Sequence, residues 1–162
     1  MFGCPLARPA TLDTVPTLFL MCGLPGSGKT TVGKRLEAEH KALRLSPDEW
    51  MARILGSGYD EAQRAEIETM QWEIAQRALG LGISVILESG FWSRSERREF
   101  RARAAELGAD SKLIFLDVPL DELVDRVVRR NALLPPGSFR VEPTDLETWA
   151  RMFERPTPDE LE

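Results

Sequence analysis

The chain has 162 residues, of which 43% are hydrophobic, with 26 acidic and 21 basic side chains and a formal net charge of -5. This length predicts one domain with a substantial core. The acidic balance disfavours a broad, sequence-independent grip on nucleic acid but leaves a local basic groove open. No apolar run approaches the ~20 residues that span a bilayer, and the first fifteen residues lack the pattern of a signal peptide. We therefore expect a cytoplasmic protein without membrane contact.

Four apolar runs are predicted as strands, and three of them are nearly continuous, as is typical of parallel strands covered on both faces. They are residues 17–22, 42–46, 83–89 and 112–118. Helical patterns follow them at residues 30–39, 49–55, 60–80, 93–107, 121–130 and 144–153. The alternation of strand and helix predicts an α/β fold with a parallel sheet. We expect a single domain over 16–162, a flexible N-terminal tail over 1–15 and a loosely held end over 156–162.

Residues 23–30, GLPGSGKT, match the G-x-x-x-x-G-K-[ST] motif (Walker A) between the first predicted strand and the first predicted helix. In such a loop, backbone N–H groups and the helix dipole surround phosphate oxygens. Lys29 supplies charge to the outer phosphates, and the Thr30 hydroxyl is a ligand for Mg²⁺. The motif indicates a nucleoside triphosphate but does not distinguish a kinase from an ATPase or a switch. The predicted nucleotide-binding residues are Gly23, Gly26, Ser27, Gly28, Lys29, Thr30 and Thr31.

Two carboxylates lie at the carboxyl ends of further predicted strands, where ligands of open parallel sheets bind. Asp48 comes just past the second strand, where it could take the proton of an attacking hydroxyl. Its alternative role is to cap the short helix at 49–55. Glu88 ends the third strand and resembles the acid that orients Mg²⁺ in phosphate-loop enzymes, the alternative being a solvated carboxylate. We expect Asp48 to act as the base, and Thr30 with Glu88 to serve the metal.

Arginines follow the third and fourth predicted strands. Arg126 and Arg130 are four residues apart on one helical face, and the proline-rich stretch 133–145 follows them. This pattern is typical of a lid that brings cations onto a transferring phosphoryl group. The alternative is that these arginines pair with nearby surface acids. Arg94 and Arg97 either reach a substrate at the rim of the third strand or belong to a solvated helix face.

Together these segments resemble the phosphate-loop kinases that include chloramphenicol phosphotransferase, zeta toxin and the kinase domain of polynucleotide kinase. The resemblance covers about residues 17–158 and is carried by GLPGSGKTT, LSPDEW, VILESGFWSRSER, LDVPLDELVDRVVRRN and FERPTPDEL. It implies a three-layer phosphate-loop NTPase fold with a helical lid and a parallel sheet of four or five strands, in the order 2-3-1-4. It also implies that Asp48 is the catalytic base, that Arg126 and Arg130 are lid arginines, and that residues 153–157 lie beside the adenine.

Two departures from that family bear on the acceptor and the metal. Polynucleotide kinases of the family carry an arginine three residues after the base, where this chain has Met51. In the family as a whole the third strand usually ends in aspartate, where this chain has Glu88. We expect an ATP- and Mg²⁺-dependent kinase whose catalytic residues are Lys29, Asp48, Arg126 and Arg130. Its first-choice acceptor is a hydroxyl-bearing small molecule, and a polynucleotide 5′-hydroxyl is the alternative. A nucleotide-binding switch with basal ATPase activity is the alternative of a different class.

Overall fold

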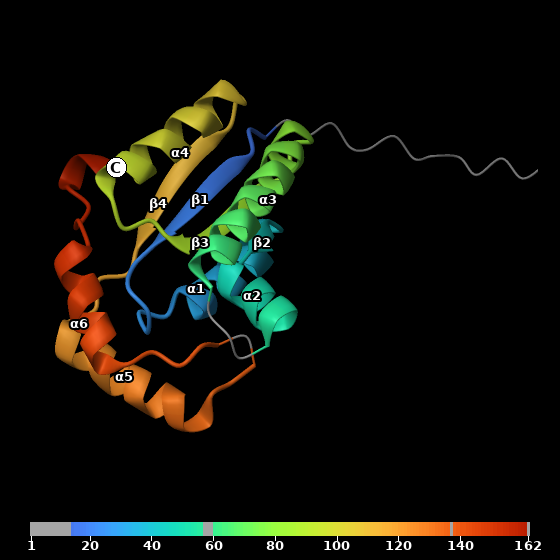
Figure 1. The fold of residues 1–162 in the computed structure, drawn as a ribbon. Coiled ribbons are helices and arrows are strands. Elements are labelled where there is room, and N and C mark those ends of the chain that lie inside the picture. The colour runs from blue at the N-terminus through green and yellow to red at the C-terminus, as the bar shows by residue number, and fades with distance from the viewer. Residues whose placement is uncertain (1–13, 57–59, 137, 162) are drawn as a thin grey trace, which may run out of the picture.

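The computed structural model describes residues 14–56, 60–136 and 138–161. The sheet consists of β1 (Thr17–Cys22), β2 (Leu43–Leu45), β3 (Val85–Gly90) and β4 (Asp110–Phe115). All neighbouring strands are parallel, and their order is β2-β3-β1-β4 (Figure 1). The predicted α/β fold with strand order 2-3-1-4 is therefore confirmed, with four strands in the described part of the chain.

Helices follow each strand in the chain. They are α1 (Lys29–His40), α2 (Pro47–Leu55), α3 (Glu61–Gly80), α4 (Arg94–Glu106), α5 (Leu120–Leu133), α6 (Pro143–Met152) and the 3-10 helix η1 (Pro158–Glu160). The start of α4 is where the sequence predicts it, because the Ser93 hydroxyl accepts a hydrogen bond from the Glu96 backbone N–H at 3.1 Å. The second strand is shorter than expected, because the Ala42 N–H donates to the Glu37 carbonyl and so belongs to the end of α1.

Helices cover both faces of the sheet, and β1 contributes to both layers because successive strand side chains point to opposite faces. Leu18 and Leu20 pack in one cluster with side chains of α3 and α4, while Phe19 and Met21 pack in another with α1. Leu18, Leu20 and Met21 have no exposed surface, and full burial of such a side chain contributes roughly 1.5–3 kcal/mol. The nearly continuous apolar pattern of this strand is explained by its position inside a sheet covered on both faces.

The helices α5 and α6 lie at the carboxyl end of the sheet rather than on a face of it (Figure 1). Leu123 and Val127 of α5 form a separate apolar cluster with Leu146 of α6. Leu24, which belongs to the glycine-rich loop, packs into the same cluster. The helix predicted as a lid is therefore packed directly against the predicted phosphate-binding loop.

The prediction of a loosely held C-terminal end is wrong. Glu160 is 3% exposed, and its carboxylate binds the guanidinium of Arg97 on α4. A buried guanidinium needs hydrogen-bond acceptors, and the chain end supplies them. Figure 1 shows this end of the chain returning to α4.

The expected N-terminal tail lies outside the described residues, apart from the exposed Thr14 and Val15. None of the helices in the described ranges combines the length and apolar character that a bilayer crossing requires.

Candidate phosphotransfer site

The glycine-rich loop leaves β1 and enters α1, as its sequence predicts. Gly26 and Gly28 have φ angles of +85° and +96°, in the left-handed region that favours glycine. A Cβ atom at Gly26 would lie 3.0 Å from Val127 Cγ2 of α5. Glycine is therefore required there both by the turn and by the close approach of α5.

Lys29 lies on the inner side of this loop. Its Nζ donates hydrogen bonds to the carbonyls of Gly23 and Leu24, both at 2.9 Å. Burial lowers the pKa of Lys29 to about 8, and the carboxylates of Asp48 and Glu88 act in the opposite direction. The lysine and both predicted acids therefore lie close enough to interact, although they come from three separate segments.

Thr30 and Glu88 also meet, as the sequence predicts for a metal site. The Thr30 hydroxyl donates to Glu88 Oε2 at 3.4 Å, and burial raises the pKa of Glu88 while Arg44 opposes that rise. Glu88 Oε1 is buried and has no hydrogen-bond partner among the described residues, and a Cβ atom at Gly33 would overlap it. The alternative of a solvated carboxylate is therefore wrong.

These two side chains fit Mg²⁺, because the ion prefers oxygen ligands, the Thr30 hydroxyl contacts Glu88 Oε2, and the other oxygen of the same carboxylate has no partner among the described residues. The described residues contain no cluster of three or more histidine, cysteine or acidic side chains that could hold a metal. Thr30 and Glu88 would therefore hold Mg²⁺ together with nucleotide phosphates, which is the usual mode for this ion.

Arg44 of β2 positions Glu88, and the sequence analysis missed it. Its guanidinium donates to Glu88 Oε2 at 3.1 Å and to both carboxylate oxygens of Glu49 at 2.8 and 2.9 Å. A third acid, Glu37, accepts from its Nε at 3.4 Å. The available signal was a charged residue inside a strand expected to be buried, because such a charge requires partners.

Asp48 lies in the first turn of α2, just past β2. Ser46 occupies the N-cap position, so the alternative in which Asp48 caps the helix is wrong. The Asp48 carboxylate is exposed and accepts a hydrogen bond from Arg64 of α3. Arg64 also pairs with Glu68 Oε1 at 3.1 Å, so it joins Asp48 to a second acid on α3. Sequence reasoning missed this link, because Arg64 lies on a helix with many charged residues.

The helix α5 carries both predicted lid arginines, and Arg126 contacts the loop. Arg126 donates to the Gly26 carbonyl at 3.4 Å and also pairs with Glu122, as the surface alternative predicts, and its role on a phosphoryl group stays a prediction. Arg130 donates to the Phe139 carbonyl at 3.3 Å, and its buried Nε has no partner among the described residues. Burial lowers the pKa of Arg130, and Asp48 opposes this effect. The second lid arginine therefore interacts with the predicted base.

Arg94 and Arg97 both bind the C-terminal segment of the chain. Arg97 is fully buried, and besides Glu160 its guanidinium donates to the backbone carbonyls of Phe91, Trp92 and Glu154. Arg94 pairs with Asp159 near the chain end. Arg97 is therefore a structural residue, and both readings offered for it by the sequence are wrong.

The segment 153–157, which the resemblance places beside the adenine, lies against β4. The ring of Phe153 stacks on Phe115, with centroids 6.0 Å apart and an interplanar angle of 17°. Arg155 lies 5.4 Å from the centroid of the Phe115 ring and pairs with Asp117. Its role beside an adenine remains a prediction.

The fold is shared with solved structures of phosphate-loop kinases. The Pnkp1/Rnl/Hen1 RNA repair complex matches with a TM-score of 0.72 and 22% identity, over 90% of this chain and 46% of that chain, so this chain spans less than half of that neighbour. A candidate kinase from Chloroflexus aurantiacus matches with a TM-score of 0.71 and 26% identity, over 90% and 84%. The APS kinase CysC of Mycobacterium tuberculosis, in complex with AMPPNP and APS, matches with a TM-score of 0.58 and 22% identity, over 87% and 83%.

A comparison with curated proteins found no match. The family described as AAA domain matches residues 18–156, which is most of the chain. The loop, the parallel sheet and this match agree, and the chain belongs to the AAA domain family.

Proposed function

We propose that this chain is an ATP-dependent phosphotransferase that moves the γ-phosphoryl group to a hydroxyl group of a small molecule. The observation that carries the proposal is the Walker A loop between β1 and α1, with Arg126 of α5 donating to its Gly26 carbonyl at 3.4 Å and with Asp48 just past β2 at the same edge of the parallel sheet. The charge of Asp48 also acts on Lys29 and Arg130, which agrees with this arrangement. A nucleotide-binding switch would need neither an acceptor-side carboxylate nor a lid with two arginines.

Each group has a separate task in this proposal. Lys29 and the loop hold the outer phosphates of ATP. Asp48 orients the acceptor hydroxyl and takes its proton as the oxygen bonds to phosphorus and the bond to ADP breaks. Arg126 and Arg130 stabilise negative charge on the transferring group. Thr30 and Glu88 would hold Mg²⁺, which when bound neutralises charge on the phosphates.

The comparisons support kinase chemistry and favour one second candidate. The APS kinase neighbour holds AMPPNP, an ATP analogue. The neighbour in an RNA repair complex favours a polynucleotide 5′-hydroxyl as acceptor. Against this second candidate, Met51 stands where the polynucleotide kinases carry an arginine, and it is fully buried. The small-molecule acceptor is therefore preferred.

The test is ADP release measured with and without a panel of hydroxylated metabolites, antibiotics and short oligonucleotides. At least one small molecule should stimulate ADP release. Lys29→Met should reduce the stimulated rate by about 10²-fold or more, which is the rate loss typical of removing one preorganised electrostatic donor. Lys34→Met, an exposed lysine on the same helix, is the matched control and should keep the rate.

Two results would contradict the proposal. Basal hydrolysis that no acceptor stimulates would indicate a switch. Stimulation by oligonucleotides alone, weakening with log salt at a slope of about -0.7 per phosphate contact, would support the polynucleotide candidate instead.

A further inference from the structure

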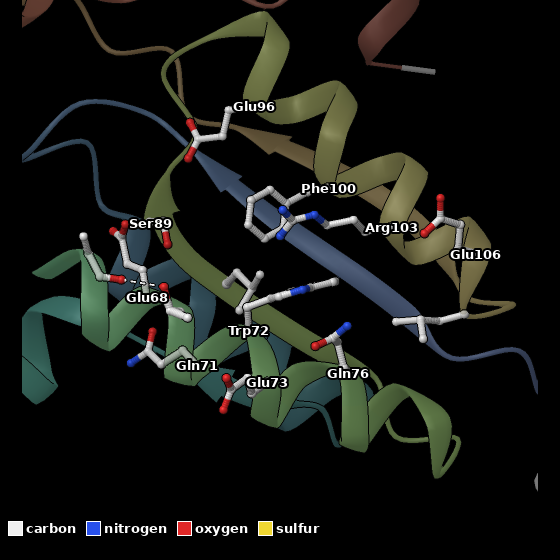
Figure 2. A pocket seen from close by; sticks show the side chains of 14 residues that line it. Glu68, Gln71, Trp72, Glu73, Gln76, Ser89, Glu96, Phe100, Arg103 and Glu106 are labelled. Atoms are coloured by element: carbon white, nitrogen blue, oxygen red, sulfur yellow. Dashed lines mark hydrogen bonds between the residues drawn. The ribbon is translucent and has the colours of Figure 1, made fainter.

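A cavity of about 620 Å³ lies between α3 and α4, beside the end of β3 (Figure 2). Its size falls within the roughly 300–1,000 Å³ of typical small-molecule sites. Trp72 of α3 and Phe100 of α4 form its apolar walls, with ring centroids 5.0 Å apart in a T-shaped contact. Figure 2 shows Glu68, Ser89 and Glu96 together at one end of the cavity.

That end of the cavity is linked to the predicted base. Arg64 pairs with both Asp48 and Glu68, and Glu68 lines the cavity. Burial raises the pKa of Glu68, the charge of Arg64 opposes this rise, and the nearby charge of Asp48 adds to it, so the two carboxylates influence each other. A molecule held in the cavity would therefore lie on the acceptor side of the phosphotransfer site.

The charge of the cavity restricts what it can hold. Its described lining contains one guanidinium, that of Arg103, and the carboxylates of Glu68, Glu73, Glu96 and Glu106. Arg103 lies over the rings of Trp72 and Phe100, at 5.4 and 5.1 Å from their centroids, and pairs with Glu99. A phosphate-rich or sulfate-bearing acceptor would meet this excess of negative charge, and its binding would be opposed.

Glu96 in particular has no ion-pair partner among the described residues. Burial and then the charge of Glu68 raise its pKa, while backbone hydrogen bonds from Ser93 and Trp92 and the charge of Arg97 act in the opposite direction without cancelling the rise. Two carboxylates that repel each other in a partly buried site favour a bound positive charge. A second observation agrees with a built site, because Gln71 lines the same cavity, is 1% exposed, and its Nε2 has no hydrogen-bond partner among the described residues.

We propose that this cavity binds the acceptor and that the acceptor is a hydroxylated amine, such as an amino sugar, whose ammonium group lies between Glu68 and Glu96. Its carbon skeleton packs on Trp72 and Phe100, and an acceptor hydroxyl extends toward Asp48. The ammonium relieves the repulsion between the two carboxylates and donates charge-assisted hydrogen bonds to both. This inference rests on the proposed function, since it assigns the acceptor of the same site.

The test measures binding by calorimetry to the full chain saturated with AMPPNP. The probes are amino sugars and amino cyclitols, each paired with the neutral compound in which a hydroxyl replaces the amine, and one oligonucleotide with a 5′-hydroxyl. At least one amine should bind about tenfold or more tightly than its neutral partner, the scale of one charge-assisted hydrogen bond.

Glu68→Gln and Glu96→Gln should each weaken binding of the amine by about tenfold or more, since glutamine has the size of glutamate but lacks its charge. Glu66→Gln removes a charge from an exposed position on α3 that does not line the cavity, so it should leave the affinity unchanged. Thermal unfolding of each variant checks that it folds.

Three outcomes would overturn the inference. No amine in the panel binds, the neutral compounds bind as tightly as the amines, or the oligonucleotide binds and its affinity increases in Glu68→Gln and Glu96→Gln. The same preparations report separately on the proposed function. A neutral alcohol that stimulates ADP release would leave phosphotransfer intact and refute the cationic acceptor. Amine binding that depends on Glu68 and Glu96 without acceptor-stimulated ADP release would support the cavity and refute the phosphotransfer.

Discussion

Replacing Glu160 with glutamine should destabilise the fold by about 3 kcal/mol, because it leaves the charge of Arg97 buried without a carboxylate partner. Arg97 is fully buried, and its Nε and Nη2 donate to the two Glu160 oxygens at 2.8 and 3.1 Å. The same guanidinium also donates to the Glu154 carbonyl at 2.9 Å. The ion pair therefore fastens the chain end to α4.

The pH dependence of the unfolding free energy gives a second estimate of how much the Arg97–Glu160 ion pair contributes to stability. Hydrogen bonds from Arg97 lower the pKa of Glu160 from an ordinary value of 4.5 to about 2. A carboxylate with a depressed pKa in the folded state contributes stability above the unfolded pKa and loses it as pH falls toward the folded pKa. At 1.36 kcal/mol for each pKa unit, the difference of about 2.5 corresponds to about 3 kcal/mol.

Urea unfolding of the original protein and Glu160→Gln, measured from pH 7 to pH 3, tests this reasoning. The difference in unfolding free energy should be about 3 kcal/mol at pH 7 and shrink to roughly 1 kcal/mol at pH 3, as Glu160 of the original protein becomes protonated in the unfolded state. Glu147→Gln is the control, because this carboxylate is exposed on α6 and forms no ion pair with a described residue; the unfolding free energy and its pH dependence should hardly change. A difference that stays constant across this pH range would refute the assignment.

Three further predictions concern catalysis. Asp48→Asn should keep ATP affinity and thermal stability but lower transfer by ~10²-fold or more, in calorimetry and initial-rate assays; full activity in the folded variant would exclude a base role. Arg126→Ala and Arg130→Ala should each lower kcat more than they raise the KM for ATP, since the lid acts on charge developing in the transition state; a change in KM alone would contradict this for that residue. Burial lowers the pKa of Lys29 to about 8, so the lysine loses its charge as pH rises through that value, and ATP affinity should fall between pH 7 and 9.5. The ATP affinity of Lys29→Met should fall less over the same range, and the same pH dependence in both proteins would refute the contact between Lys29 and ATP.

The sheet and the loop could be predicted because their signals are local. The apolar run at 17–22, the glycine motif at 23–30 and the helix that follows are contiguous, and each is consistent with its neighbours. Asp48 could be placed because parallel strands bring their carboxyl ends to one edge, so a short segment past a strand has a known position.

The parts that sequence reasoning missed depend on partners far apart in the chain. Arg97 sits in a helix rich in charged residues, which resembles a solvated face, but it is buried against Glu160, 63 residues away. Arg44 binds Glu88 on the neighbouring strand β3, 44 residues along the chain. The cavity between α3 and α4 forms only when the two helices pack side by side on one face of the sheet. No local pattern contains that information.

The central claim is that the phosphoryl group passes from ATP to an acceptor alcohol with Asp48 as base. The most direct test follows ATP labelled at the γ-phosphoryl group, in the presence of an acceptor that stimulates ADP release, with the original protein, Asp48→Asn and Lys29→Met. The label should appear in the acceptor with the original protein and fall by ~10²-fold or more with each variant, while Asp48→Asn still binds ATP. Label that enters only inorganic phosphate, or equal transfer by Asp48→Asn, would contradict the account.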